Sequence, residues 1–211
     1  MGERLNFGKR LFDLIGAVLL LVLFSPVLLV TAILVRSKLG TPVIFIQQRA
    51  GYQGRPFAIY KFRSMTNQRD AAGNLLPDAM RFTSFGNFLR RSSLDELPQL
   101  LNVLKGDLSL VGPRPLFLEY LPHYTAAHAR RLEVKPGITG WAQVNGRNLL
   151  TWEEKFQLDV WYVDNATVWL DLKILAMTVK KVLAKEGIDG QNHLPVPYFA
   201  GNLPENTSTG N

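Results

Sequence analysis

Hydrophobic and polar positions divide this chain into one long apolar stretch and a series of shorter, alternating ones. The apolar stretch Leu14–Val35 has 22 residues. As a helix, that length spans the roughly 30 Å hydrocarbon core of a bilayer. It is too long for the core of a signal peptide, and no convincing small-residue cleavage site follows it. The pattern therefore predicts an N-terminal helix in the membrane.

Ser25-Pro26 lies in the middle of this stretch. Proline lacks an N–H and clashes with the carbonyl four residues earlier, so a kink or break is expected there, and the Ser25 hydroxyl can satisfy a freed carbonyl. A helix–break–helix that re-enters the same side and a spanning helix are equally compatible with these residues. Both flanks are basic, which orients no span but suits two cytoplasmic ends. The flanking residues are Arg4, Lys9, Arg10, Arg36 and Lys38.

The remaining pattern predicts an α+β, mostly helical fold. Val43–Gln48 and Phe57–Ser64 alternate as the strands of a β-hairpin, and Asp107–Val111 is a further short strand. Thr66–Pro77 is polar and indicates a mobile loop. Helices are expected over Phe82–Arg91, Leu97–Leu104, Glu119–Glu133 (one polar helix or a pair), Thr151–Asp164 (opened by a capping box) and Trp169–Lys185. The expected organisation is a membrane helix over residues 1–38, a catalytic domain over 39–200 and a disordered tail over 201–211.

Charge changes the picture by pointing to a partner. The net charge is +7, and residues 1–63 carry nine Lys/Arg against Glu3 and Asp13, which accounts for the whole excess. Basic residues beside an apolar segment favour anionic lipid headgroups over nucleic acid. Within this part, Lys61, Arg63 and Arg49 are candidates for facing a phosphorylated substrate instead. The absence of cysteine excludes disulfides, thiolate zinc sites and a cysteine nucleophile.

The most distinctive candidate chemistry is the acidic pair Asp95-Glu96. With Ser93 as N-cap, Glu96 closes a capping box; with Asp95 as N-cap, Pro98 occupies the third helical position. Either register places both carboxylates in a first helical turn, where the helix dipole favours the ionised form. Capping alone would also explain the pair.

Cations around the pair favour catalysis over capping. Arg90 and Arg91 precede it, and Arg114 is held between Pro113 and Pro115, which prepares a guanidinium for a bidentate phosphate contact. Arg147 follows a tight turn and is a weaker candidate. Cations for phosphate oxygens, a carboxylate for Mg²⁺ and a second carboxylate as nucleophile are what phosphoryl transfer requires.

These motifs resemble the bacterial sugar transferases, the monotopic polyprenyl-phosphate phosphoglycosyl transferases, and most of all the minimal enzyme that initiates bacterial N-linked glycan assembly. The resemblance covers nearly the whole chain, in order. The matching segments are Lys9–Asp13, Phe24–Pro26, Ile59–Met65, Ser93–Glu96, Asn102–Asp107, Val111–Pro115 and Lys135–Arg147.

The resemblance implies a re-entrant helix broken at Ser25-Pro26 in the bacterial inner membrane, with the catalytic domain on the cytoplasmic face. It implies transfer of a phospho-sugar from a UDP-sugar to polyprenyl (undecaprenyl) phosphate, with release of UMP and a requirement for Mg²⁺. Asp95 would attack the β-phosphorus, and Glu96 would help to bind Mg²⁺ or would act as a base. The phosphate-binding residues would be Lys61, Arg90, Arg114 and Arg147.

Several alternatives stay open at this point. UDP-N,N′-diacetylbacillosamine or a UDP-N-acetylhexosamine is the expected donor, with UDP-galactose or UDP-glucose as the alternative. A non-catalytic membrane adaptor would release no UMP. A membrane-tethered nucleic-acid binder is disfavoured because residues 64–211 are charge-neutral. A homodimer is neither required nor excluded by the sequence.

Overall fold

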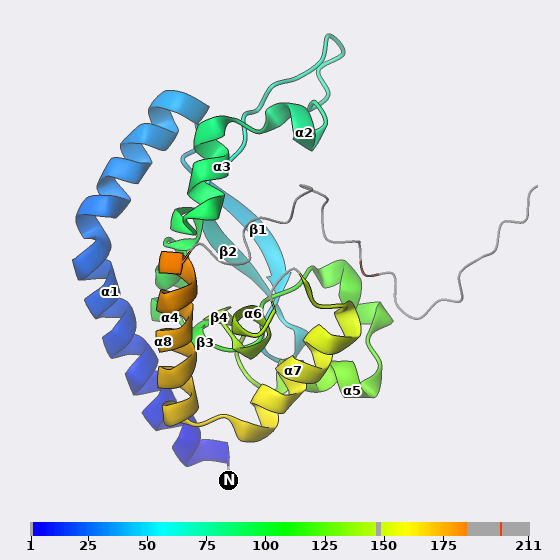
Figure 1. The fold of residues 1–211 in the computed structure, drawn as a ribbon. Coiled ribbons are helices and arrows are strands. Elements are labelled where there is room, and N and C mark those ends of the chain that lie inside the picture. Colours follow the sequence, from blue (N-terminus) through cyan, green and yellow to red (C-terminus); the bar gives the residue numbers. More distant parts are fainter. Residues whose placement is uncertain (1, 147–148, 185–198, 200–211) are drawn as a thin grey trace, which may run out of the picture.

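The computed structural model describes residues 2–146, 149–184 and 199, and its fold is α+β and mostly helical, as predicted (Figure 1). The expected tail over residues 201–211 lies outside the described residues. The N-terminal half contains α1 (Gly2–Leu39), β1 (Ile44–Ala50), η1 (Tyr52–Gly54), β2 (Pro56–Phe62), α2 (Asp78–Arg81), α3 (Ser84–Arg91), η2 (Leu94–Glu96) and α4 (Gln99–Lys105). The C-terminal half contains β3 (Ser109–Val111), η3 (Leu118–His123), α5 (Ala126–Ala129), η4 (Arg130–Glu133), β4 (Gly137–Thr139), α6 (Trp141–Val144), α7 (Trp152–Asn165) and α8 (Val168–Ala184).

The expected break at Ser25-Pro26 is not an interruption, which corrects the helix–break–helix prediction. α1 is one helix of 38 residues with Pro26 inside it, bowed along one side of the molecule (Figure 1). Pro26 cannot donate to the carbonyl of Val22, four residues earlier. The Ser25 hydroxyl donates to that same carbonyl oxygen at 2.8 Å, as the sequence predicted, so the carbonyl keeps a partner and the helix continues.

The first half of α1 packs into the core of the folded domain. Asp13 is buried, and its Oδ1 accepts hydrogen bonds from the Leu110 amide and the Ser109 hydroxyl, both at 3.0 Å. Gly16 permits this approach, because a Cβ there would lie 2.6 Å from Leu110 Cδ1. Ala17 is fully buried in the main hydrophobic cluster. Residues well inside the apolar stretch are therefore also core residues.

The far end of α1 is anchored to the same domain. Val35 and Leu39 are buried in a second cluster with Phe62 of β2 and Leu89 of α3. Much of the remaining apolar surface of the helix is exposed, and α1 is the one helix in the described ranges that is long and apolar enough to cross a membrane. Because both of its ends contact one domain, α1 lies along that domain instead of projecting from it.

Two small sheets organise the rest. β1 and β2 form the predicted antiparallel hairpin, and β3 pairs in parallel with β4, a strand that was not predicted. The polar helix or helix pair expected over Glu119–Glu133 is wrong, because the segment forms the short pieces η3, α5 and η4. η3 contains Pro122 and is followed by an extended Tyr124, and η4 follows α5 directly. Proline within a short segment prevents a continuous α-helical hydrogen-bond ladder.

The two C-terminal helices agree with the sequence. Thr151 and Glu154 form the predicted reciprocal capping box at the start of α7. α7 and α8 are tied to the core by Tyr162, whose hydroxyl lies 2.7 Å from Asp171 Oδ1 and 3.1 Å from the Val111 carbonyl oxygen. Asp171 in turn binds Lys9 Nζ of α1 at 2.7 Å, so α1 and α8 are fastened to each other.

Candidate active site

The acidic pair lies in the short turn η2, between α3 and α4. Neither predicted capping register is present: Ser93 has a left-handed backbone (φ 56°) and makes no side-chain cap, and α4 starts only at Gln99. An N-cap residue needs an extended backbone, which Ser93 does not have. The left-handed Ser93 instead turns the chain after α3, and a non-glycine residue in this region is a mark of strain often found at functional sites.

Glu96 is the centre of an ion-pair cluster. Its Oε1 accepts hydrogen bonds from Lys61 Nζ at 2.7 Å and from Arg114 Nη2 at 2.8 Å. Lys61 comes from β2 and Arg114 from the segment after β3, so residues far apart in the sequence converge on one carboxylate oxygen. Burial opposes ionisation of Glu96, but Arg114 and Lys61 outweigh it and hold the pKa of this carboxyl well below its usual range.

Asp95 lies in a different environment from its neighbour. It is 7% exposed, and its Oδ1 is buried without a hydrogen-bond partner among the described residues. Burial, followed by the negative charge of Glu96, raises the pKa of Asp95 to about 6, against the opposing effect of Lys61, Arg90 and Arg114. A buried carboxylate oxygen with no partner, facing several cations, is poised for a ligand or a reaction.

Arg114 is positioned by the backbone around it. Gly112 and Gly137 lie against each other where β3 meets β4; a Cβ on Gly137 would lie 2.1 Å from the Gly112 nitrogen. The Gly137 amide donates to the Pro113 carbonyl at 3.0 Å. From the other side, buried Arg131 donates to the Arg114 carbonyl at 2.7 Å while it is paired with Asp159. The guanidinium is thus presented by a rigid segment.

Of the other predicted phosphate-binding residues, only Arg90 is placed near the acidic pair by the described part of the structure. Arg90, at the end of α3, is held by Ser64 Oγ at 2.9 Å and stacks over the Phe82 ring at 4.5 Å; its charge is near enough to act on Asp95. Arg147 lies outside the described residues. Arg63 does not join the pair: it is buried beside the like charge of Arg81.

Arg49 belongs to this site more clearly than the sequence indicated. Its guanidinium stacks on the Phe117 ring at 3.6 Å, Nη2 donates to Gln47 Oε1 at 2.7 Å, and Nε is buried without a partner among the described residues. It makes no ion pair with a described carboxylate. Burial and then the like charge of Arg114 lower the pKa of Arg49 to about 10, so it remains a cation at neutral pH.

The donor set fits a magnesium ion that also binds substrate phosphates. Mg²⁺ usually takes one or two carboxylates, and phosphate oxygens and waters complete its octahedron. Asp95 Oδ1 has no partner and Glu96 is adjacent, whereas the described residues contain no cluster of three or more His, Cys, Asp or Glu. These residues suit an ion that arrives with the substrate better than a metal cage made by the protein alone.

Comparison with known proteins agrees with this geometry. The family model described as bacterial sugar transferase matches residues 4–185, and the chain belongs to that family. The chain is 62% identical to the uncharacterized sugar transferase EpsL of Bacillus subtilis, covering 92% of this chain and 96% of that protein.

Other relatives carry names that specify a reaction, and two of them serve as examples. The chain is 41% identical to the undecaprenyl-phosphate galactose phosphotransferase of Salmonella typhimurium, over 86% of this chain and 42% of that protein. It is 43% identical to the UDP-glucose:undecaprenyl-phosphate glucose-1-phosphate transferase of Escherichia coli, over 82% of this chain and 39% of that protein. The chain thus spans about two fifths of the length of each of these two relatives.

Proposed function

We propose that this protein is a phosphoglycosyl transferase that moves a phospho-sugar from a UDP-sugar to polyprenyl phosphate through a covalent intermediate on Asp95. The observation that carries the proposal is the buried, unpartnered oxygen of Asp95 beside the Lys61–Glu96–Arg114 cluster. A non-catalytic adaptor has no use for such a carboxylate, because burying charge without a partner costs stability.

In the first step, a carboxylate oxygen of Asp95 attacks the β-phosphorus of the UDP-sugar. A phosphorus–oxygen bond forms to Asp95, the bond between the two phosphates breaks, and UMP leaves with the bridging oxygen. Arg114 and Arg49 would hold the diphosphate, and Lys61 would neutralise the charge that develops on it; Arg114 and Lys61 both contact Glu96, the neighbour of Asp95. A bound Mg²⁺, held by Asp95 and Glu96, would supply further charge neutralisation.

In the second step, an oxygen of polyprenyl phosphate attacks the same phosphorus atom. The bond to Asp95 breaks, the carboxylate is restored, and a polyprenyl diphosphate-sugar is formed. Glu96 would help to hold Mg²⁺ in this step, because Arg114 and Lys61 keep the pKa of its carboxyl well below the usual range and make it a weak base. The two-step route lets one site serve a water-soluble donor and a lipid-bound acceptor in turn.

We propose a monotopic enzyme on the cytoplasmic face of the bacterial inner membrane, and the placement of α1 supports the monotopic arrangement. Both ends of α1 contact one domain, and the outward apolar face between them is exposed. That face can enter one leaflet while the charged site stays at the interface. The basic flanks, which include Arg10 and Arg36, suit anionic headgroups.

The relatives named for galactose and glucose support UDP-galactose or UDP-glucose as donor ahead of the UDP-N,N′-diacetylbacillosamine that the resemblance implied. UDP-N-acetylhexosamines remain the third class to test. The donor is the one that releases UMP when mixed with enzyme, undecaprenyl phosphate and Mg²⁺. Release of UMP from none of these donors would favour the adaptor.

The covalent step is tested by intact-mass analysis of the enzyme mixed with that donor in the absence of lipid. A phospho-sugar adduct is expected on Asp95. Asp95→Asn should form no adduct and lose at least about a thousandfold in turnover, because the nucleophile is gone. Asp164→Asn, which changes an exposed aspartate paired with Arg130, is the matched control and should behave as the wild type. Product formation without an adduct would contradict the mechanism.

A further inference from the structure

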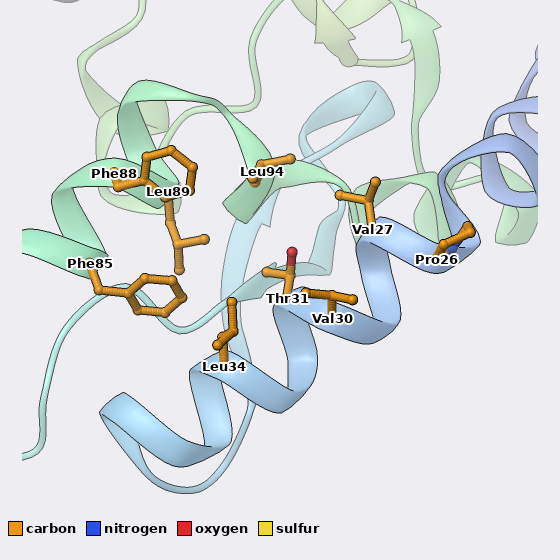
Figure 2. A pocket seen from close by; sticks show the side chains of 9 residues that line it. All are labelled: Pro26, Val27, Val30, Thr31, Leu34, Phe85, Phe88, Leu89 and Leu94. Atoms are coloured by element: carbon orange, nitrogen blue, oxygen red, sulfur yellow. The ribbon is translucent and has the colours of Figure 1, made fainter.

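An apolar groove with a volume of about 320 Å³ lies between the second half of α1 and the α3–η2 segment (Figure 2). This is near the lower end of the range of small-molecule pockets, roughly 300–1,000 Å³. Among the described residues that line it, Thr31 alone has a polar side chain. The two walls face each other across the groove and include Val27, Val30 and Leu34 of α1, Phe85 and Phe88 of α3, and Leu94 of η2.

The inner part of the groove adjoins the acidic pair. Leu94, which lines it, immediately precedes Asp95 in η2. α3, which supplies the phenylalanine side of the groove, ends in the segment that carries Arg90, whose charge acts on Asp95. A chain lying in the groove therefore has one end beside the proposed nucleophile.

The outer part of the groove opens onto the lipid-facing side of α1. Val30 is 55% exposed and Phe88 is 56% exposed, although both line the groove. The exposed apolar face of α1 continues from this wall. The groove thus connects the proposed membrane face with the site of chemistry.

We infer that this groove holds the part of the polyprenyl chain nearest the acceptor phosphate, an inference that rests on the proposed function. The acceptor phosphate must reach the phosphorus on Asp95, so its hydrocarbon tail has to start next to η2. A methyl-branched isoprenoid chain matches an apolar wall of Val, Leu and Phe. The nucleotide sugar does not match it, because its diphosphate and hydroxyls would lose hydration without gaining hydrogen-bond partners.

An ordinary phospholipid acyl chain is the competing occupant. Nothing in the reaction brings a phospholipid headgroup to Asp95, whereas the acceptor phosphate must reach that residue to react. Photocrosslinking distinguishes a polyprenyl chain from a phospholipid acyl chain in the groove. A polyprenyl phosphate that carries a photoreactive diazirine near its phosphate end should crosslink to the inner part of the groove, at Leu94. Undecaprenyl phosphate should displace the probe, and phosphatidylglycerol at the same concentration should not.

A filling substitution tests the groove in the reaction. Val30→Trp should raise the KM for undecaprenyl phosphate about tenfold or more, since it fills an apolar subsite. Adduct formation from the donor alone does not use the groove, and its rate reports that the fold and Asp95 are intact. Ile33→Trp is the matched control: Ile33 is on the same helix, is 59% exposed and does not line the groove.

The outcomes for the groove and for the covalent mechanism are separable. A Val30→Trp enzyme with the wild-type KM, or crosslinks displaced equally by phosphatidylglycerol, would overturn the groove assignment while leaving the covalent mechanism untouched. A wild-type enzyme that forms no adduct would contradict the covalent mechanism, and the crosslinking competition would still decide what the groove binds.

Discussion

Asp95 and Glu96 are neighbours in the sequence, yet the folded protein gives their carboxyl groups opposite properties. The side chains of Arg114 and Lys61 keep Glu96 ionised, whereas burial and the charge of Glu96 raise the pKa of Asp95 to about 6. Separation of the pKa values of two adjacent acids commonly accompanies a division of roles. It fits Glu96 as a permanent anion that orders the cations, and Asp95 as the group that reacts.

The pH dependence of adduct formation follows from this arrangement. In the proposed mechanism Asp95 attacks only as the carboxylate, so the rate of adduct formation from the UDP-sugar should fall as pH decreases through about 6. Arg114→Ala removes a cation that favours the carboxylate, so the acid limb should move to higher pH. Rapid-quench measurements of adduct formation between pH 5 and 8 give the pH–rate profiles of the wild type and of Arg114→Ala. A wild-type rate that stays constant down to pH 5 would be inconsistent with Asp95 as the nucleophile.

Arg49 offers a separate test at the residue scale. Arg49→Ala should raise the KM for the UDP-sugar about tenfold, because a charge-assisted contact to the diphosphate is lost. Arg55→Ala, which removes an exposed arginine close to the same hairpin turn, is the control and should leave KM unchanged. Steady-state kinetics of UMP release checks both variants, and an unchanged KM for Arg49→Ala would assign it to structure alone.

At the scale of elements, α1 shows how a proline is accommodated in an apolar helix. Pro26 removes a hydrogen-bond donor, and the Ser25 hydroxyl occupies the acceptor that is left, the Val22 carbonyl. In lipid, no water is present to take over this role. The two residues therefore form one local unit.

A double-mutant cycle tests this unit. Ser25→Ala alone should destabilise the protein by about 1 kcal/mol, because the Val22 carbonyl loses its partner. In a Pro26→Ala background the backbone N–H is restored, so the same change should have almost no effect. Thermal unfolding in detergent micelles measures the free energy of unfolding of the wild type, the two single variants and the double variant. Equal effects of Ser25→Ala in both backgrounds would show that the hydroxyl does not compensate for the proline.

The sequence predicted those elements whose signals are local. The hairpin, the capping box at Thr151 and the hydroxyl at Ser25 each depend on residues a few positions apart. β4 and the turn η2 were missed because tertiary contacts fix them: β4 exists by pairing with β3, and η2 by the left-handed Ser93. The residue types of the site could be predicted, but not their pairing.

Contacts across the fold explain the remaining gaps in the predicted site. Nothing near Arg49 in the sequence shows that Phe117 will stack on it, and nothing near Glu96 shows that one of its oxygens will bind both Lys61 and Arg114. Arg131 gives no signal of its own, although it holds the Arg114 carbonyl from a distance of 17 positions. Such partners become visible only when the chain is folded.

At the scale of the whole molecule, membrane topology is the central prediction. The chain contains no cysteine, so Glu3→Cys and Lys38→Cys each introduce a single labelling site. Because both ends of α1 contact one domain, both sites should be labelled from the cytoplasmic side in sealed vesicles, and neither from the other side. Labelling of the two sites from opposite sides would demonstrate a span.

The buried carboxylate of Asp13 limits how α1 can be exchanged between proteins. A foreign membrane helix in place of α1 would still bring the catalytic domain to the bilayer. It would, however, leave the Leu110 amide without its hydrogen-bond acceptor and the space that Ala17 occupies in the core unfilled. Chimeras joined at this point should be recovered as misfolded protein. α1 and the catalytic domain are therefore expected to evolve as one unit.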